Sequence, residues 1–188
     1  MRLELASRKA VKYAVEKWHY SGNAAPRAYD LPFAVFEDNQ FCGVICYGRG
    51  ATNEIGSPYG MKSGEAVELI RVALNGKQKV TSQAVGISLR ILRNYAPNTK
   101  LVVSFADIEQ GHVGTIYQAT NWLYMGMTIP ADEYILNGTR IHGRTYRSKG
   151  SPAGAVKVKG SSKFRYLYAW DKKLRNELSK QSLSYPRG

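Results

Sequence analysis

Residues 101–126 read LVVSFADIEQGHVGTIYQATNWLYMG, and this stretch decides the fold. The run at 101–106 is short, rich in β-branched residues and bounded by polar ones. It predicts a strand buried on both faces, in the middle of a mixed or parallel sheet. A glycine-flanked helix over about 112–121 and a strand over 123–127 are predicted to follow. A strand, a helix and a strand in this order are typical of an α/β domain, whose sites lie beyond the carboxyl ends of its strands.

The elements upstream extend this alternation. A three-and-four spacing of apolar residues predicts helices over 8–18, where Ser7 can cap the first turn, and over 81–95. Short apolar runs predict strands over 33–37, 41–47 and 67–74. Together these elements predict an α/β (α+β) fold, in which helices flank a mixed central sheet.

Length and composition are those of one ordinary domain with a core. The 188 residues are 44% apolar and contain no run of eighteen apolar residues, and the first ten lack the apolar stretch of a secretory leader. We therefore expect a soluble, cytosolic protein. Cys42 and Cys46, four residues apart, are predicted to share one face of a strand, too far apart for a bridge. Two thiols exclude a disulfide framework and a four-cysteine zinc site.

Positive charge is concentrated at the carboxyl end. Residues 1–138 carry 14 basic and 12 acidic side chains, whereas residues 139–188 carry 13 and 2. A segregated basic segment with interleaved aromatics, as in FRYLYAW at 164–170, is typical of nucleic-acid binding. A solvated face or a disordered tail is the alternative. We predict a core over 1–138 and a basic, DNA-binding portion over 139–188 that completes the same domain, with a mobile low-complexity loop over 143–163.

Two charged side chains within apolar strands are candidates for chemistry. Asp107 follows the buried strand, where a desolvated carboxylate suits a general base acting on an amine of low basicity, or else caps the next helix. Arg71 interrupts the apolar strand over 67–74. It either forms an internal ion pair or holds a phosphate or carbonyl oxygen in the site.

Two further groups of residues could bind a cofactor. Ser82 and Gln83 begin the helix over 81–95, whose backbone N–H groups suit an anion, and Lys79 would support one. His19, Asp107 and His112 have the residue types of a two-histidine, one-carboxylate iron site, although they lack a close spacing in the sequence. Our main prediction includes no metal, and iron is the alternative.

The order of elements resembles that of GCN5-related N-acyltransferases. A narrower resemblance rests on WHYSG (18–22), ELIRVAL (68–74), SFADIEQGHVGTIYQATNWLYMG (104–126), HGRTYR (142–147) and KFRYLYAWDKKLR (163–175). These motifs resemble the Mom family of phage proteins and cover most of the chain. The resemblance implies an enzyme that converts adenine in duplex DNA to N6-carbamoylmethyladenine and so protects phage DNA from host restriction, in the host cytoplasm.

The resemblance also implies roles for single residues. Tyr117 matches the tyrosine that protonates the leaving thiolate in acyltransferases of this fold, and a core tyrosine is the alternative. His19 and Tyr20 match a family pair, and Gly114 lies in the motif expected to face the cofactor. The acyltransferase phosphate loop has no counterpart in QKVTSQAVG at 78–86, where Gly86 comes late. The donor therefore stays open between acetyl-CoA and glycyl-tRNA.

A carbamoylmethyl group cannot come from simple acetyl transfer, which would leave a carbonyl on the exocyclic nitrogen. Transfer of a glycyl group followed by rearrangement gives the product without a redox step, and a thioester donor oxidised with iron is the alternative. The rival functions are an acyl-CoA-dependent N-acetyltransferase of a small amine or protein, and a DNA-binding module with an inert core. The sequence indicates no oligomeric state.

Duplex DNA is the expected partner, and tRNA a possible second one. The pairing edge of adenine is occupied in a duplex, so the base is expected to flip into a pocket. We expect Phe105, Trp122, Tyr124 or Tyr146 to stack on it, unless each is a core residue. The residues predicted to hold the phosphate backbone are all basic: Arg140, Arg144, Arg147, Lys149, Lys157, Lys159, Lys163 and Arg165.

Overall fold

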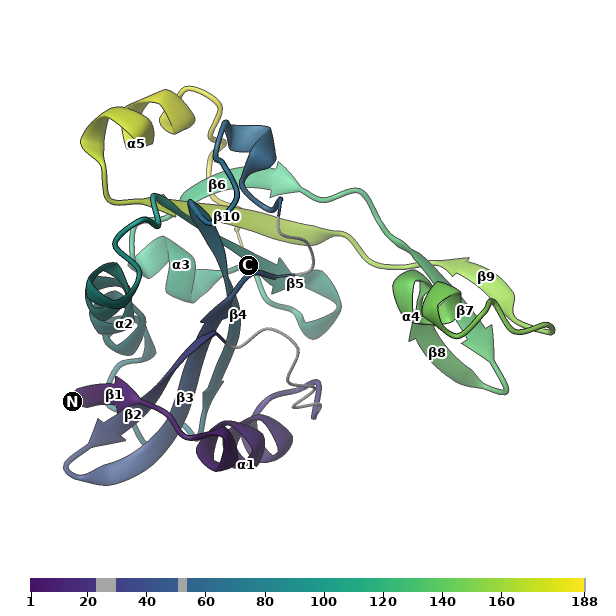
Figure 1. Cartoon of the computed structure of the whole chain (residues 1–188), viewed down its shortest axis with the longest axis horizontal. Coiled ribbons are helices and arrows are strands. Elements are labelled where there is room, and N and C mark those ends of the chain that lie inside the picture. The colour runs from purple at the N-terminus through teal and green to yellow at the C-terminus, as the bar shows by residue number, and fades with distance from the viewer. Residues whose placement is uncertain (23–29, 51–53, 188) are drawn as a thin grey trace.

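A computed structural model describes residues 1–22, 30–50 and 54–187. Its core is a seven-stranded sheet in the order β1-β2-β3-β4-β5-β10-β6 (Figure 1). The β4–β5 pair is parallel and every other neighbouring pair in this sheet is antiparallel. The strands are β1 (Arg2–Leu5), β2 (Leu31–Glu37), β3 (Gln40–Gly48), β4 (Ala66–Leu74), β5 (Leu101–Asp107), β6 (Leu123–Met127) and β10 (Lys163–Ala169). The predicted mixed sheet is confirmed.

Helices cover both faces of this sheet. α1 (Arg8–Trp18) packs Val11, Ala14 and Val15 on one face, and its first turn is capped by Ser7, whose hydroxyl accepts the Ala10 N–H. α2 (Thr81–Tyr95) and α3 (Thr115–Ala119) cover the opposite face, while α5 (Lys172–Ser179) and a 3-10 turn, η1 (Ser57–Tyr59), lie on the face of α1. No helix in the described ranges is long and apolar enough to cross a membrane.

The centre of the sheet follows the sequence prediction closely. Residues 101–104 of β5 are fully buried between β4 and β10. α2 has the predicted bounds, but α3 is shorter than the expected 112–121. Gly111 and Gly114 have φ angles of +68° and +79°, so the chain is left-handed just before Thr115 and a right-handed helix begins only there.

The predicted orientation of the two cysteines is wrong. Both are buried and free, but Cys42 packs in the cluster beneath α2 and Cys46 in the cluster beneath α1. The register between β2 and β3 shifts near Gly43, whose φ is +131°, and such a bulge turns the following side chains to the other face.

β4 and β5 pair over only three residues and then separate. The last pair is Glu68 with Val103, yet β4 continues to Leu74 and β5 to Asp107. The pairing of β4 with β3 also shifts here, so that Ile70 is an extra residue in the strand. Ser104 Oγ donates to the Leu69 carbonyl, 2.8 Å away, at the point of separation. The separation opens the sheet on the side where β5 ends.

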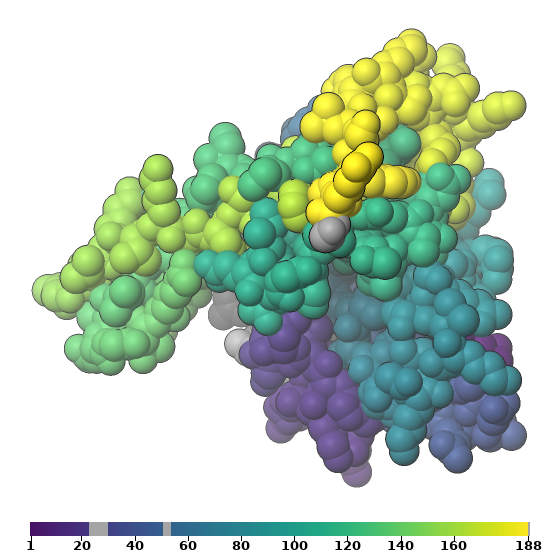
Figure 2. Space-filling model, turned by 180° about the vertical axis from the view of Figure 1, so that it is seen from behind, coloured from purple at the N-terminus to yellow at the C-terminus, as the bar shows by residue number. Residues whose placement is uncertain are grey.

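Between β6 and β10 the chain leaves the core and forms a second unit, which we call the arm (residues 129–162). Its strands form an antiparallel sheet in the order β8-β7-β9, and Figures 1 and 2 show it standing off the core. The elements are β7 (Asp132–Leu136), β8 (Thr139–His142), α4 (Gly143–Ser148) and β9 (Val156–Lys159).

The prediction of a loop over 143–163 is therefore wrong. His142 caps α4 by accepting the Arg144 N–H, and the VKVK alternation of β9 pairs with β7. The glycine, serine and proline residues that suggested low complexity lie mainly in the turns between these elements. β10 then returns to the core between β5 and β6.

Candidate active site

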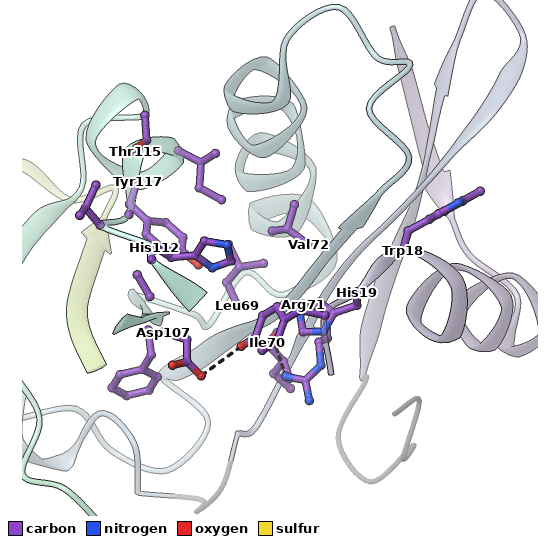
Figure 3. A pocket seen from close by; sticks show the side chains of 17 residues that line it. Trp18, His19, Leu69, Ile70, Arg71, Val72, Asp107, His112, Thr115 and Tyr117 are labelled. Atoms are coloured by element: carbon purple, nitrogen blue, oxygen red, sulfur yellow. Dashed lines mark hydrogen bonds between the residues drawn. The ribbon is translucent and has the colours of Figure 1, made fainter. Parts of the chain in front are cut away.

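A cavity of about 450 Å³ opens where β4 and β5 separate (Figure 3). Its walls come from the end of α1, from β4 and β5, and from the loop that leads into α3. Residues that were predicted from widely separated motifs meet on these walls. They are His19, Tyr20, Arg71, Asp107, His112, Gly114 and Tyr117.

Asp107 lies on one wall at the end of β5, with a side chain only 13% exposed. Its carboxylate accepts the Glu109 N–H at 3.1 Å, so it caps a 3-10 turn, η2 (Ile108–Gln110), and not α3. Tyr20 Oη donates to the other carboxylate oxygen from 3.5 Å, and Lys163 Nζ lies 3.4 Å from the same oxygen. The carboxylate is thus contacted by two donors from different parts of the fold, Tyr20 after α1 and Lys163 on β10.

Tyr20 connects Asp107 to the two histidines. Its ring lies 4.3 Å from that of His19 and 5.7 Å from that of His112, measured between centroids. Burial and the nearby Asp107 charge raise the pKa of Tyr20, so its hydroxyl keeps its proton at neutral pH. Burial and the Arg71 charge lower the pKa of His19 to about 4. The Ser21 N–H donates to Nδ1 of His19, so the neutral ring carries its proton on Nε2.

The alternative iron site is not assembled. In the described part of the chain no three His, Cys, Asp or Glu residues are placed to hold a metal ion. The ring of Tyr20 packs against both His19 and His112, and Nδ1 of His19 is already taken by Ser21.

Tyr117 is buried on α3, on another part of the cavity wall. Its hydroxyl is 2.8 Å from Ser104 Oγ, which joins it to the point where the strands separate. Burial raises the pKa of Tyr117 to about 12. The ring packs between Trp122 and Tyr166, at centroid distances of 5.1 and 5.0 Å. Tyr117 is thus a core residue whose hydroxyl end faces the cavity.

Arg71 does not form the internal ion pair that was one of its two predicted roles. Among the described residues no carboxylate lies within 4 Å of its guanidinium. Nη1 donates to the Ile70 carbonyl at 2.8 Å, and the buried Nε has no partner in the same ranges. A buried donor without a partner on a cavity wall fits the other prediction, an oxygen of a ligand.

The start of α2 is not part of this cavity. Lys79, Ser82 and Gln83 are absent from its described walls. The Lys79 N–H donates to the buried Glu37 carboxylate at 3.2 Å, and Glu37 also pairs with the terminal ammonium of Met1 at 3.1 Å. The Lys79 N–H is therefore taken by a carboxylate and is not free for an anion. These residues therefore fit the pyrophosphate of coenzyme A poorly.

The predicted phosphate-binding residues divide into two groups. The first group already has partners within the protein. Arg140 pairs with Glu109 at 3.3 Å and with Glu133, and Lys163 pairs with Asp107. Lys157 pairs with Asp132 at 2.8 Å, and Arg165 donates to Tyr59 Oη at 3.1 Å. The second group is exposed and has no ion pair with another described residue. It comprises Arg144, Arg147, Lys149 and Lys159. The free positive charge of the predicted set therefore lies on the arm.

The predicted stacking residues also divide. Trp122 and Tyr124 are 0% and 7% exposed in the core, so they cannot stack on a base. Tyr146 is stacked on Tyr134 in the arm, with centroids 3.7 Å apart. Phe105 lines the cavity. Their side chains are all aromatic, so the sequence alone could not separate core residues from residues on the cavity wall.

Sequence reasoning missed Ser104. It is the only polar residue in the buried run LVVSFA, and that was the available signal. It also missed that Lys163 faces Asp107, because a contact between two strands 56 positions apart leaves no local pattern.

Comparisons with known proteins agree with this geometry. The profile of the Mom protein family matches residues 1–187. The methylcarbamoylase mom of Escherichia phage Mu is 25% identical over 193 residues, which cover 95% of this chain and 79% of that protein.

Solved acetyltransferases share the fold at low identity. Aminoglycoside acetyltransferase AAC(6')-Ib, solved with coenzyme A and kanamycin, superposes with a TM-score of 0.58 at 8% identity, over 93% of this chain and 96% of that one. A variant of the spermidine N-acetyltransferase SpeG of Vibrio cholerae gives 0.57 at 9% identity, over 94% and 99%. The fold is that of the GCN5-related N-acyltransferases.

Proposed function

The chain belongs to the Mom protein family, and we propose that it is a transferase that modifies adenine in duplex DNA, with N6-carbamoylmethyladenine as the product. One observation carries the proposal. One cavity contains both a carboxylate, Asp107, and a phenol, Tyr117. β10, the strand that follows the basic arm, places Lys163 against Asp107 and so connects the arm to this cavity.

In this proposal Asp107 is the base. The exocyclic amine of adenine is a poor nucleophile because its lone pair is delocalised into the ring. A carboxylate that accepts a proton from this amine as the nitrogen attacks lowers the barrier. Tyr20 and Lys163 fix the orientation of the carboxylate by their contacts with it.

Tyr117 is the acid in this proposal. A phenol with a pKa of about 12 is a weak acid for a thiolate, whose conjugate acid has a pKa of about 8.5, because the proton transfer would be uphill. An alkoxide leaving group is a stronger base and suits this phenol better. The raised pKa therefore supports an ester donor, such as glycyl-tRNA, over acetyl-CoA. The poor fit of the α2 start to a pyrophosphate supports the same choice.

The proposed reaction conserves every atom. Attack of the exocyclic nitrogen on the glycyl ester breaks the ester C–O bond and releases the tRNA hydroxyl, protonated by Tyr117. The glycyl amine then attacks the ring carbon that bears this nitrogen. The bond from that carbon to the original nitrogen breaks, and the nitrogen leaves as the carboxamide of a carbamoylmethyl group. No oxidant is needed.

In this proposal Arg71 and the free cations of the arm bind the oxygen atoms and phosphates of the substrates. The orphaned Nε of Arg71 suits an oxygen of the donor, either of its carbonyl or of a phosphate. The free cations of the arm suit the DNA backbone, and the same charge would serve a tRNA donor. Such an enzyme would act in the host cytoplasm and protect phage DNA from restriction.

Nucleoside mass spectrometry on DNA from bacteria that express this chain tests the proposal. The test variant is Asp107→Asn, which keeps the shape and the cap of η2, and the control is Glu177→Gln on the exposed surface of α5. We expect carbamoylmethyl deoxyadenosine with the wild type and the control, and none with Asp107→Asn at equal soluble protein.

Two results would contradict the proposal. An acetyl mass on adenine would replace the glycyl donor by acetyl-CoA. Unmodified DNA in the presence of folded wild-type protein would favour an acyl-CoA-dependent N-acetyltransferase of a small amine or protein.

A further inference from the structure

The first residue of the arm, Ile129, has an apolar side chain that is exposed to solvent. Ile129 is 91% exposed, more than any other large apolar side chain in the described part of the chain. Its neighbours Met127 and Pro130 are exposed as well. This side chain contributes nothing to the core and is free to contact a partner.

The backbone holds this residue firmly on both sides. The Thr128 N–H donates to the Lys163 carbonyl at 2.8 Å, and the Lys163 N–H donates to Thr128 Oγ1 at 2.9 Å. Two residues later, the Ala131 carbonyl accepts the Gly160 N–H at 2.8 Å. The proline that follows restricts Ile129 to extended conformations, and its β-branched side chain has few rotamers. Ile129 is therefore presented in a fixed direction.

The same contacts place Ile129 close to the cavity. Lys163 lies opposite Asp107 on one side, in the β10–β5 register, and bonds Thr128 on the other. Neighbouring strands are about 4.8 Å apart, so Thr128 is about 10 Å from Asp107 across the sheet, and Ile129 follows it. Beyond Ile129 the arm carries the exposed cations Arg144 and Arg147.

We propose that Ile129 is a wedge that enters the base stack of duplex DNA at the place the target adenine leaves. This inference rests on the proposed function, because it supplies the step that brings adenine to Asp107. A flipped nucleotide stays bonded to its neighbours, so the group that fills the gap must lie close to the pocket that receives the base. Apolar side chains of this kind separate base steps in proteins that distort DNA, and the positive arm selects nucleic acid as the occupant.

The test measures base opening without any donor. Duplexes that contain 2-aminopurine at several adenine positions are titrated with wild-type protein and with three variants, and fluorescence reports unstacking while anisotropy reports binding. Ile129→Ala removes the wedge and Ile129→Leu keeps it. Val156→Ala is the matched control, because Val156 is a 63% exposed apolar residue elsewhere on the arm.

We expect wild type, Ile129→Leu and Val156→Ala to raise the fluorescence at saturation. We expect Ile129→Ala to lower the equilibrium constant for base opening about ten-fold, while its affinity for the duplex stays close to that of the wild type. An equal rise with Ile129→Ala, or binding of the wild type without any rise, would overturn the wedge.

Mass spectrometry of cellular DNA separates this inference from the proposed function. If the wild type opens bases but leaves adenine unmodified, the proposed function fails and the wedge remains. If the wild type and Ile129→Ala modify adenine equally, the wedge fails and the proposed function remains.

Discussion

Gly114 should be one of the most sensitive positions on the cavity wall. Its φ is +79°, and a Cβ built on it would lie 2.4 Å from the Tyr166 ring. The left-handed conformation costs alanine about 1–2 kcal/mol, and overpacking of a filled site costs about 1–3 kcal/mol. We therefore expect Gly114→Ala to lower the free energy of unfolding by about 2–5 kcal/mol.

Gly111 offers a matched control in the same loop. Its φ is +68°, but nothing lies within 4 Å of its built Cβ, so Gly111→Ala carries only the conformational cost of about 1–2 kcal/mol. Urea unfolding followed by circular dichroism measures both losses. The difference between them isolates the contact with Tyr166.

This contact also links stability to the site. The Tyr166 hydroxyl donates to the Val113 carbonyl, and its ring packs on Tyr117. An added methyl group at Gly114 therefore pushes on the proposed acid, and adenine modification should fall more in Gly114→Ala than in Gly111→Ala. Equal losses of stability in the two variants would refute this reasoning.

Three other predictions follow from the charges and the buried hydroxyl groups. Replacing Arg144 and Arg147 together by Gln should weaken duplex binding and reduce the slope of log K against log salt by about 1.8, as measured by anisotropy over a salt series. Burial lowers the pKa of His19 to about 4 in the folded protein, whereas its pKa in the unfolded chain is near 6.5. As the pH falls, the unfolded chain therefore binds the proton first, and the free energy of unfolding should decrease from pH 6.5 toward pH 4. His19→Gln should flatten this part of a plot of urea midpoint against pH. Ser104→Ala and Ser88→Ala each remove a buried hydroxyl that bonds a tyrosine and a carbonyl, and each should cost about 1–3 kcal/mol in urea unfolding. Only Ser104→Ala should also reduce adenine modification, since Ser104 bonds the hydroxyl of Tyr117 on the cavity wall, whereas Ser88 bonds Tyr47, which does not line the cavity.

The parts of the fold that depend on local pattern could be predicted from the sequence. The apolar run of β5 and the periodicity of α2 define their own bounds, because burial along one element leaves a repeat in the residues. The arm was missed because its strands are only four or five residues long and its turns are rich in glycine and serine. Pairing between such short strands depends on contacts that no short window contains.

The site divides in the same way. Asp107 could be selected because it stands at the end of an apolar strand, and Tyr117 because it matches the tyrosine of the family that the sequence resembles. The fold then brings them to one cavity. For the basic residues, the sequence showed their number and position but not which of them are paired with acidic side chains. Arg140 pairs with Glu133 on β7 and Lys163 with Asp107 on β5, and a sequence shows the charge of a side chain but not its partner.

The two ends of the arm make it a self-contained insertion. Thr128 and Lys163 already face each other, joined by one backbone hydrogen bond and by one from the Lys163 N–H to the Thr128 hydroxyl, so a short turn such as Asn-Gly could connect them. We therefore expect that residues 129–162 can be exchanged for such a turn, which leaves the core sheet intact, or for another inserted unit. A core of this fold can in this way carry a different inserted unit without any change to the strands that form its cavity.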